Sequence, residues 1–243
     1  MEPKGAASPR TAVVWAVLRQ ELDRATGPLT VLDVGGGTGG FAVPLATAGH
    51  RVTVVDASPD ALAALTRRAA EAGVADRIRA VQGDGDGLGE LIAADSADLV
   101  LCHSLLEVVD DPGTVVKALA ATLRPGGVAS VLVANRVAAV LGRAVSGHLD
   151  VATALLTDPD GSVGGRDTLR RRFDHDAACN LLVGAGLVIE QTHGVRVIAD
   201  LLPGNVLEGQ IEALLAFEMA TSALTPYRDV ATQLHLFARR PAR

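Results

Sequence analysis

The segment Val31–Gly40, which reads VLDVGGGTGG, constrains the fold more than any other part of this chain. An apolar run typical of a buried strand leads into a cluster of glycines and then into a helical stretch. Glycine tolerates backbone conformations and close approaches that a Cβ atom would prevent. A helix that begins at such a loop directs its free N–H groups toward a bound ligand. The segment therefore predicts a strand, loop and helix unit that holds a nucleotide-like cofactor.

Two classes of cofactor fit this glycine loop. Gly35, Gly37 and Gly40 match G-x-G-x-x-G, which alone is a weak signature of dinucleotide binding. Asp33 favours a different ligand, because a carboxylate beside the loop repels a pyrophosphate and attracts cationic groups. S-adenosylmethionine carries an ammonium and a sulfonium and is such a ligand. Asp56 ends the next apolar run, where a carboxylate can accept both hydroxyls of a ribose, and this fits either cofactor.

Strand-like apolar runs alternate with helical stretches along the first half of the chain. This alternation predicts an α/β fold built on a doubly wound parallel sheet. The five predicted strands are Thr30–Val34, Val52–Val55, Ile78–Gln82, Ala97–Cys102 and Val128–Ala134.

Three further motifs follow in a fixed order between these runs. GDGDGL spans Gly83–Leu88, HSLLEVVDDP spans His103–Pro112, and LRPGGV spans Leu123–Val128. The ordered set resembles the class I S-adenosylmethionine-dependent methyltransferases over nearly the whole chain. The resemblance implies a Rossmann-like, seven-stranded, mostly parallel sheet with an antiparallel last strand and helical insertions after strands 5 and 6.

The resemblance also implies a set of residues that contact S-adenosylmethionine. In this family the glycine loop holds the methionine part, the acidic loop after the third strand meets adenine, and the segment after the fourth strand lies beside the cofactor. Arg10 is expected to clamp the methionine carboxylate, and Asp33 is expected to act through water. The implied contacts are Arg10, Asp33, Gly35, Gly36, Gly37, Asp56, Ala57, Asp84, Gly85, Asp86 and His103.

Several segments narrow the resemblance to the bacterial tRNA 5-carboxymethoxyuridine methyltransferases. They include GHRVTVVDAS, HSLLEVVDDP, Asn135 after the fifth strand, GVRVIADLL at Gly194–Leu202, and the ending LHLFARRP. That family forms a methyl ester on the carboxylate of a modified wobble uridine. The resemblance therefore implies that the anticodon region of tRNA is the partner.

Composition leaves a second class of acceptor open. Aromatic residues make up 2% of the chain and the formal net charge is −6, so surfaces for stacking bases and binding phosphates are scarce. Arg166 and Arg170–Arg172 form the one basic cluster after the fifth strand. They either contact phosphates or form a solvated face. A small metabolite with a carboxylate or hydroxyl group is the alternative acceptor, and a cofactor-binding module without catalysis is a third hypothesis.

Transfer to a carboxylate needs few catalytic side chains. A carboxylate is ionised at neutral pH, so alignment and desolvation matter more than a general base. Arg196 is the predicted partner, because its planar guanidinium can bind a carboxylate bidentately; a structural ion pair with Asp200 is the alternative. An alcohol or amine acceptor would need a base, and His103 is the predicted one. No metal site is predicted, since the Asp84 loop lacks the spaced carboxylates of a calcium loop.

Length and composition predict one domain over residues 1–243, with 49% hydrophobic residues to build its core. A helix is expected over Arg136–Leu156, and the span Thr157–Arg166 is a candidate lid. Glu208, Glu212 and Glu218 either line the substrate entrance or belong to a solvated helix face. The predicted parts are an N-terminal helical segment (1–28), a cofactor-binding half (29–135), and a substrate-side half (136–243) with insertions at 136–175 and 197–229.

The chain shows no signal segment and no apolar run of membrane-spanning length. Cys102 and Cys179 stand apart in apolar surroundings, as expected of reduced thiols. These features predict a cytoplasmic protein without a membrane partner, and they leave the oligomeric state open.

Overall fold

A computed structural model describes residues 8–158, 160–162, 167–202 and 209–242. Its centre is a seven-stranded sheet in the order β3-β2-β1-β4-β5-β7-β6. All neighbouring strands pair in parallel except β7, which is antiparallel to both β5 and β6. This confirms the predicted fold class. The strands are β1 (Thr30–Val34), β2 (Arg51–Asp56), β3 (Ile78–Gln82), β4 (Ala97–His103), β5 (Leu123–Ala134), β6 (Val188–Val195) and β7 (Gln233–Arg239).

The strand order reverses between β1 and β4, which are hydrogen-bonded neighbours in the centre of the sheet. Asp33 of β1 stands opposite Val54 of β2 on one side and Leu101 of β4 on the other. Ligands of open α/β sheets bind outside the carboxyl ends of the strands at such a reversal. The fold therefore places the end of β1 and the glycine loop at the expected position of a ligand.

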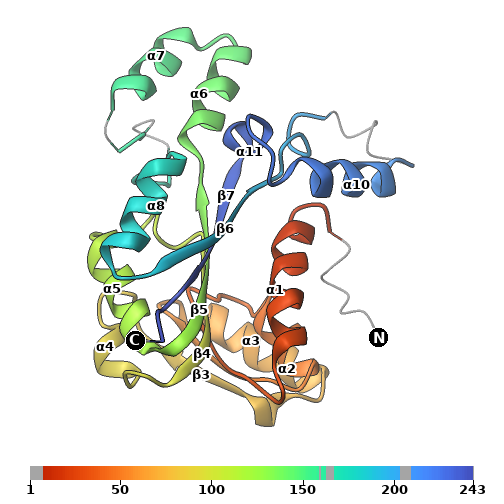
Figure 1. The fold of residues 1–243 in the computed structure, drawn as a ribbon, viewed down its shortest axis with the longest axis vertical. Coiled ribbons are helices and arrows are strands. Elements are labelled where there is room, and N and C mark those ends of the chain that lie inside the picture. Colours follow the sequence, from red (N-terminus) through yellow and green to blue (C-terminus); the bar gives the residue numbers. More distant parts are fainter. Residues whose placement is uncertain (1–7, 159, 163–166, 203–208, 243) are drawn as a thin grey trace.

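Helices cover both faces of the sheet, as Figure 1 shows. One face carries α1, α2 and α3, and the other carries α4, α5 and α8. Two insertions supply the remaining helices. The helices are α1 (Ala12–Arg24), α2 (Ala42–Thr47), α3 (Pro59–Glu71), α4 (Leu88–Leu91), α5 (Pro112–Thr122), α6 (Arg136–Val145), α7 (Leu149–Thr157), α8 (His175–Gly184), α10 (Ile211–Thr221) and α11 (Tyr227–Val230), with a short 3₁₀ turn at Ala75–Arg77.

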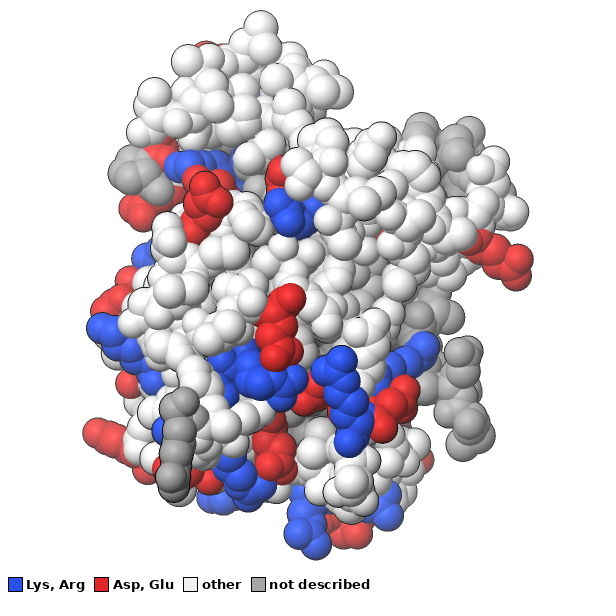
Figure 2. All heavy atoms as spheres, in the orientation of Figure 1, with Lys and Arg blue, Asp and Glu red and all other residues white. Residues whose placement is uncertain are grey.

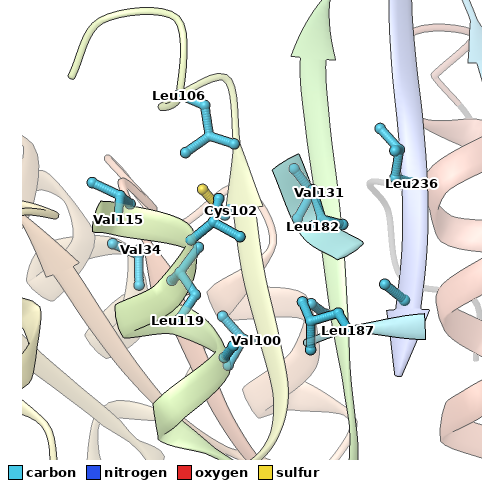
Figure 3. Packing of buried hydrophobic residues seen from close by; sticks show 14 of the residues in the cluster. Val34, Val100, Cys102, Leu106, Val115, Leu119, Val131, Leu182, Leu187 and Leu236 are labelled. Carbon is cyan, nitrogen blue, oxygen red and sulfur yellow. The ribbon is translucent and has the colours of Figure 1, made fainter. Parts of the chain in front are cut away.

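Each face buries its own apolar cluster. On the α5 and α8 side, Leu119 and Leu182 pack onto Val100 and Val131 of the central strands, as Figure 3 shows. On the other side, the apolar stripe of α1 packs against β1, β4 and β5, and Trp15 is buried with it. Both faces of the central strands are thus buried, which explains their continuous apolar runs.

Side-chain caps fix where the helices near the carboxyl edge begin. Ser58 accepts a hydrogen bond from the Ala61 amide at 3.2 Å, and Asp111 accepts one from the Gly113 amide at 2.8 Å. Each cap is followed by a proline at the first helical position, where the missing N–H costs no hydrogen bond. These caps fix the starts of α3 and α5.

Both insertions leave the sheet at its carboxyl edge (Figure 1). The helix expected over Arg136–Leu156 is in fact two helices, α6 and α7. The chain turns between them at Gly147, whose φ of +81° is a left-handed conformation that ends a helix. The second insertion starts and ends at one point, because the Thr232 amide donates to the Arg196 carbonyl at 3.1 Å.

No helix in the described part of the chain is long and apolar enough to cross a bilayer. Some predicted features lie outside the described residues. They are Arg166, Glu208 and half of the candidate lid, namely residues 159 and 163–166.

Candidate functional site

A cavity of about 270 Å³ opens at the carboxyl ends of the first strands. A larger groove of about 690 Å³ lies at the opposite edge of the sheet, near Pro28 and His50, and holds none of the predicted site residues. We take the smaller cavity as the site, because three loops bring predicted residues to its wall. These residues are Gly35, Asp56, Ala57, Asp84, Gly85 and Asp86.

Three positions of the glycine loop require glycine, for two different reasons. Gly35 and Gly37 have φ values of +72° and +53°, which strain any other residue. A Cβ on Gly36 would lie 2.6 Å from the carboxyl group of Asp33. Gly40 has nothing within 4 Å of its ideal Cβ position, so it does not make the close contact expected of the third glycine in a dinucleotide loop.

Asp33 is buried beneath this loop with 3% of its surface exposed. Its Oδ2 atom has no hydrogen-bond partner among the described residues. Burial, together with the negative charge of Asp56, raises the pKa of Asp33 to about 7. An unpartnered carboxylate of this kind favours a cationic ligand, because a nearby positive charge stabilises its ionised form.

Asp56 organises two turns at once. Its Oδ2 accepts a hydrogen bond from the Gly37 amide at 2.8 Å, and its Oδ1 accepts one from the Ser58 amide at 2.9 Å. Each carboxylate oxygen has a second lone pair that these bonds do not use. Asp56 therefore shapes the glycine loop and can also accept hydroxyl hydrogens from the cavity that it lines.

The acidic loop after β3 forms the opposite wall. Asp84 accepts a hydrogen bond from the Gly87 amide at 2.9 Å, which closes the turn. Leu105 reaches across the cavity, since its side chain lies 3.2 Å from an ideal Cβ on Gly35 and 3.6 Å from one on Gly85. Leu105 was not among the predicted site residues, although an apolar side chain here provides a surface for a flat ring.

His103, at the end of β4, lies beside the cavity rather than in its lining. The edge of the Phe41 ring meets its imidazole with centroids 4.6 Å apart, and Phe41 in turn stacks on Trp15 at 5.0 Å. Burial lowers the pKa of His103 to about 3, although a hydrogen bond to the Ser130 backbone opposes this. The ring is therefore neutral at physiological pH.

Arg196 directly follows β6 and adopts a left-handed backbone with φ of +59°. Its Nη1 atom forms an ion pair with the Oδ2 atom of Asp200 at 3.1 Å, which is the structural contact weighed as an alternative. Its Nε atom is buried and has no partner among the described residues. The geometry thus contains the structural ion pair and a buried guanidinium N–H that is unpaired among the described residues.

The other predicted arginines lie outside these three loops, although Arg170 also lines the cavity. Arg10 is exposed just before α1 and is not in the cavity lining. Arg170 pairs with Asp110, Arg171 donates to backbone carbonyls of residues 106, 109 and 110, and Arg172 pairs with Asp167. Arg170 and Arg171 therefore bind the loop after β4, whereas Arg172 binds Asp167 in its own segment.

Comparison with known proteins decides the family. A profile of the methyltransferase domain matches residues 31–127. The tRNA 5-carboxymethoxyuridine methyltransferase of Escherichia coli K12 is 32% identical over 240 residues, covering 96% of this chain and 88% of that protein. This chain belongs to the class I S-adenosylmethionine-dependent methyltransferases. A ubiquinone biosynthesis O-methyltransferase from Xanthomonas axonopodis pv. citri is 33% identical over 165 residues, covering 68% of this methyltransferase and 65% of the relative.

A solved structure shows the same fold. The S-adenosylmethionine-dependent methyltransferase from Mesorhizobium loti aligns with a TM-score of 0.66 and 22% identity, covering 96% of this methyltransferase and 100% of that chain. The cofactor of this methyltransferase is S-adenosylmethionine. The chemistry of the site fits that group, since the Oδ2 atom of Asp33 beneath the glycine loop has no partner among the described residues and Asp56 has unused lone pairs.

The sequence did not predict that two glutamates near the site, Glu107 and Glu218, are buried. Glu107 of this methyltransferase is 1% exposed, and its Oε1 accepts a hydrogen bond from the Ala134 amide at 2.6 Å. Glu218 is fully buried, so neither the substrate entrance nor a solvated face describes it. The one sequence signal for the burial of Glu218 was its position inside an apolar helical run.

Proposed function

We propose that this methyltransferase transfers a methyl group to a carboxylate, with Arg196 as the group that holds the acceptor. The observation that carries the proposal is which nitrogens of its guanidinium group have partners. Asp200 occupies Nη1, while the buried Nε has no partner among the described residues. An unpaired buried donor is costly, so an arriving carboxylate that accepts from the Nε side would relieve that cost.

The backbone around Arg196 supports this role. The Glu218 carboxylate accepts hydrogen bonds from the amides of Val197 at 2.7 Å, Ile198 at 3.0 Å and Ala199 at 2.9 Å. These bonds hold the turn that follows Arg196 and keep its strained backbone in place. A preorganised side chain loses less entropy when it binds its ligand.

The position of Arg196 also supports the proposal. Gln233 of β7 pairs with Val195 in the sheet and donates a hydrogen bond to the hydroxyl of Ser104 at 3.0 Å. Arg196 and the end of β4 thus share the carboxyl edge of the sheet. When bound, S-adenosylmethionine supplies an electrophilic methyl group on a sulfonium. The chain needs only to align the carboxylate, to shield it from water and to balance its charge.

We propose 5-carboxymethoxyuridine in tRNA as the acceptor. The support is the 32% identity, over 96% of this chain, to a protein named for that reaction. A reconstituted reaction with S-adenosylmethionine and tRNA that carries 5-carboxymethoxyuridine tests it, with nucleoside mass spectrometry as the readout. Appearance of the methyl ester supports the proposal, and its absence in a reaction that methylates free acids refutes it.

A small carboxylic acid is the second candidate, and the surface of the substrate side favours it. Residues 136–232 contain 12 acidic residues and 8 arginines, with no lysine. Figure 2 shows that the surface over α6 and α7 is almost free of charge in this view. Exposed apolar side chains lie on these insertions, including Val145 at 85% and Leu156 at 65% exposure. Such a surface suits an apolar acid better than a polyanion.

Replacement of Arg196 tests the role of the guanidinium. We expect Arg196→Gln to lower kcat/KM roughly 100-fold, because breaking a buried charge pair costs about 2–5 kcal/mol. Cofactor affinity measured by calorimetry should stay within about twofold. Arg143→Gln is the matched control, since Arg143 is an exposed arginine on α6. An Arg196→Gln protein that is folded and fully active would contradict the proposal.

A further inference from the structure

A buried asparagine lies where the two insertions meet at the edge of the sheet. Asn135 follows β5, is 2% exposed and directly precedes α6. Its side-chain oxygen accepts a hydrogen bond from the Val137 amide at 3.0 Å. Its Nδ2 atom donates to the carbonyls of Asp229 at 2.9 Å and of Ala231 at 2.7 Å, at the end of the second insertion. One side chain therefore binds both insertions.

These bonds satisfy the ends of two helices that have opposite needs. α6 and α11 lie next to each other, as Figure 1 shows. The start of α6 has free N–H groups and needs an acceptor, whereas the end of α11 has free carbonyls and needs a donor. A primary amide carries an acceptor oxygen and two N–H donors, while a carboxylate has no donor and a serine has one hydrogen. Asparagine thus pairs both helix ends, and neither aspartate nor serine can do so.

The backbone of Asn135 extends this link to Arg196. The Asn135 amide donates to the Thr232 carbonyl at 3.0 Å, and the Thr232 amide donates to the Arg196 carbonyl at 3.1 Å. Arg196 is therefore two backbone hydrogen bonds away from the residue that caps α6. A displacement of α6 or α11 at Asn135 would loosen the segment that holds the backbone of Arg196.

The residues on either side of this asparagine bind two further segments of the site. The Ala134 amide donates to the buried carboxylate of Glu107, in the loop after β4 whose next residues line the cavity. Arg136 forms an ion pair with Asp174, where the first insertion returns to the sheet. Residues 134–136 thus connect the cofactor side, the first insertion and the second insertion at one point.

We propose that Asn135 is a positioning residue that fixes α6 and α11 to the backbone of Arg196, so that both insertions hold the acceptor as one unit. The link itself rests on the hydrogen bonds alone, whereas its use in aligning the acceptor rests on the proposed function. Methyl transfer depends on alignment, and a misplacement of about 1 Å can lower a rate roughly 100-fold. Loss of the link should therefore lower kcat and leave cofactor affinity intact.

Asn135→Ser tests the link, because a serine hydroxyl still caps α6 but cannot donate to two carbonyls. Hydrogen exchange of the full chain should become about tenfold faster at the Thr232 amide and stay unchanged at the Val137 amide. Asn135→Asp keeps the size and the cap and removes both donors, so this second variant should show the same pattern. Asn180→Ser, at an exposed position of α8, is the matched control and should change neither amide. Natural exchange at Thr232 in the folded Asn135 variants would overturn the link.

Kinetics test the positioning role. With S-adenosylmethionine and tRNA that carries 5-carboxymethoxyuridine, we expect kcat of both Asn135 variants to fall roughly tenfold. The dissociation constant of S-adenosylmethionine, measured by calorimetry, should stay within about twofold. A natural kcat in a folded variant with faster exchange at Thr232 would overturn the positioning role. If the natural protein does not methylate this tRNA, the proposed acceptor is refuted, exchange at Thr232 still decides the link, and kcat is compared on the free acid that the protein methylates.

Discussion

Asp33 is a carboxyl group whose charge the protein stabilises poorly on its own. It lies beneath the glycine loop, its Oδ2 atom has no partner among the described residues, and Asp56 adds a second negative charge. Its pKa of about 7 means that the folded protein binds a proton there at pH values where an unfolded chain does not. A cation bound in the cavity would stabilise the ionised form of Asp33 and so lower its pKa.

The sign of the effect on stability follows from the two pKa values. The unfolded carboxyl titrates near its ordinary value of 3.8, whereas the folded one titrates at about 7. Between these values the folded state holds more protons, so the stability of the protein falls as pH rises through this window. We expect Asp33→Asn to remove that fall, which makes the variant more stable than the natural protein by roughly 2–4 kcal/mol at pH 8.

Urea unfolding of the cofactor-free proteins at pH 5 and pH 8 checks this expectation. The stability gap between Asp33→Asn and the natural protein should grow from the first pH to the second. Asp86→Asn is the matched control, because Asp86 is exposed on the cavity wall. Parallel pH profiles for Asp33→Asn and the natural protein would show that Asp33 titrates normally.

Single residues of the site differ in how far the sequence reveals them. The position of Asp56 follows from its place after an apolar run, because the end of a parallel strand is fixed by the strand itself. The ion pair of Arg196 with Asp200 was one of two alternatives predicted from the sequence, and the sequence alone does not choose between them. The close approach of Leu105 to Gly35 and Gly85 could not be predicted, because it depends on the path that the loop after β4 takes across the sheet.

At the level of elements, the helix α10 stabilises the turn beside the site through one buried side chain. Glu218 on this helix binds three consecutive backbone amides in the turn after Arg196. A glutamine at this position keeps one acceptor oxygen but carries an NH₂ group in place of the other. This NH₂ group cannot accept a hydrogen bond from the backbone amide that it faces. The turn and the helix should therefore separate more readily.

We expect Glu218→Gln to lower the free energy of unfolding by about 1–3 kcal/mol, which is the cost of leaving buried donors unpaired. Hydrogen exchange should speed up at the amides of residues 197–199 more than elsewhere. Glu212→Gln on the exposed face of the same helix should change neither quantity. Equal hydrogen-exchange rates at these amides in the natural protein and in Glu218→Gln would show that Glu218 does not stabilise the turn.

The strands were predictable because central parallel strands are buried on both faces and read as continuous apolar runs. Their observed ends differ from the predicted ones by few residues in most cases, with β5 longer at its start. The helices of the insertions were harder to predict. The turn at Gly147 divides α6 from α7. This break could not be predicted, because a helix can tolerate a single glycine inside its apolar pattern.

Across the whole molecule, charge limits how tRNA could bind. The net charge is −6, and the arginines at 170, 171 and 172 already bond to groups of the protein itself. Few cations on the described substrate side therefore remain to replace the counterions of a phosphate backbone. Binding of tRNA, if it is the acceptor, must then draw mainly on contacts with the modified base.

We expect the affinity for tRNA to depend weakly on salt. A plot of log affinity against log salt concentration should have a slope shallower than about −2, since each phosphate contact on a single strand contributes about −0.7. Fluorescence anisotropy with labelled tRNA between low and physiological salt measures this slope. A slope of about −4 or steeper would reveal a basic surface that the described part of the chain does not show.

The bond between the Thr232 amide and the Arg196 carbonyl has a consequence for how such enzymes diversify. It closes the second insertion at its base, so the sheet is complete whatever the loop contains. Lengthening an already closed loop is cheap, because each doubling of its length costs only about 0.6 kcal/mol. Changes in this insertion that keep the Glu218 contacts can thus alter the acceptor while the methyl-donor half is inherited unchanged.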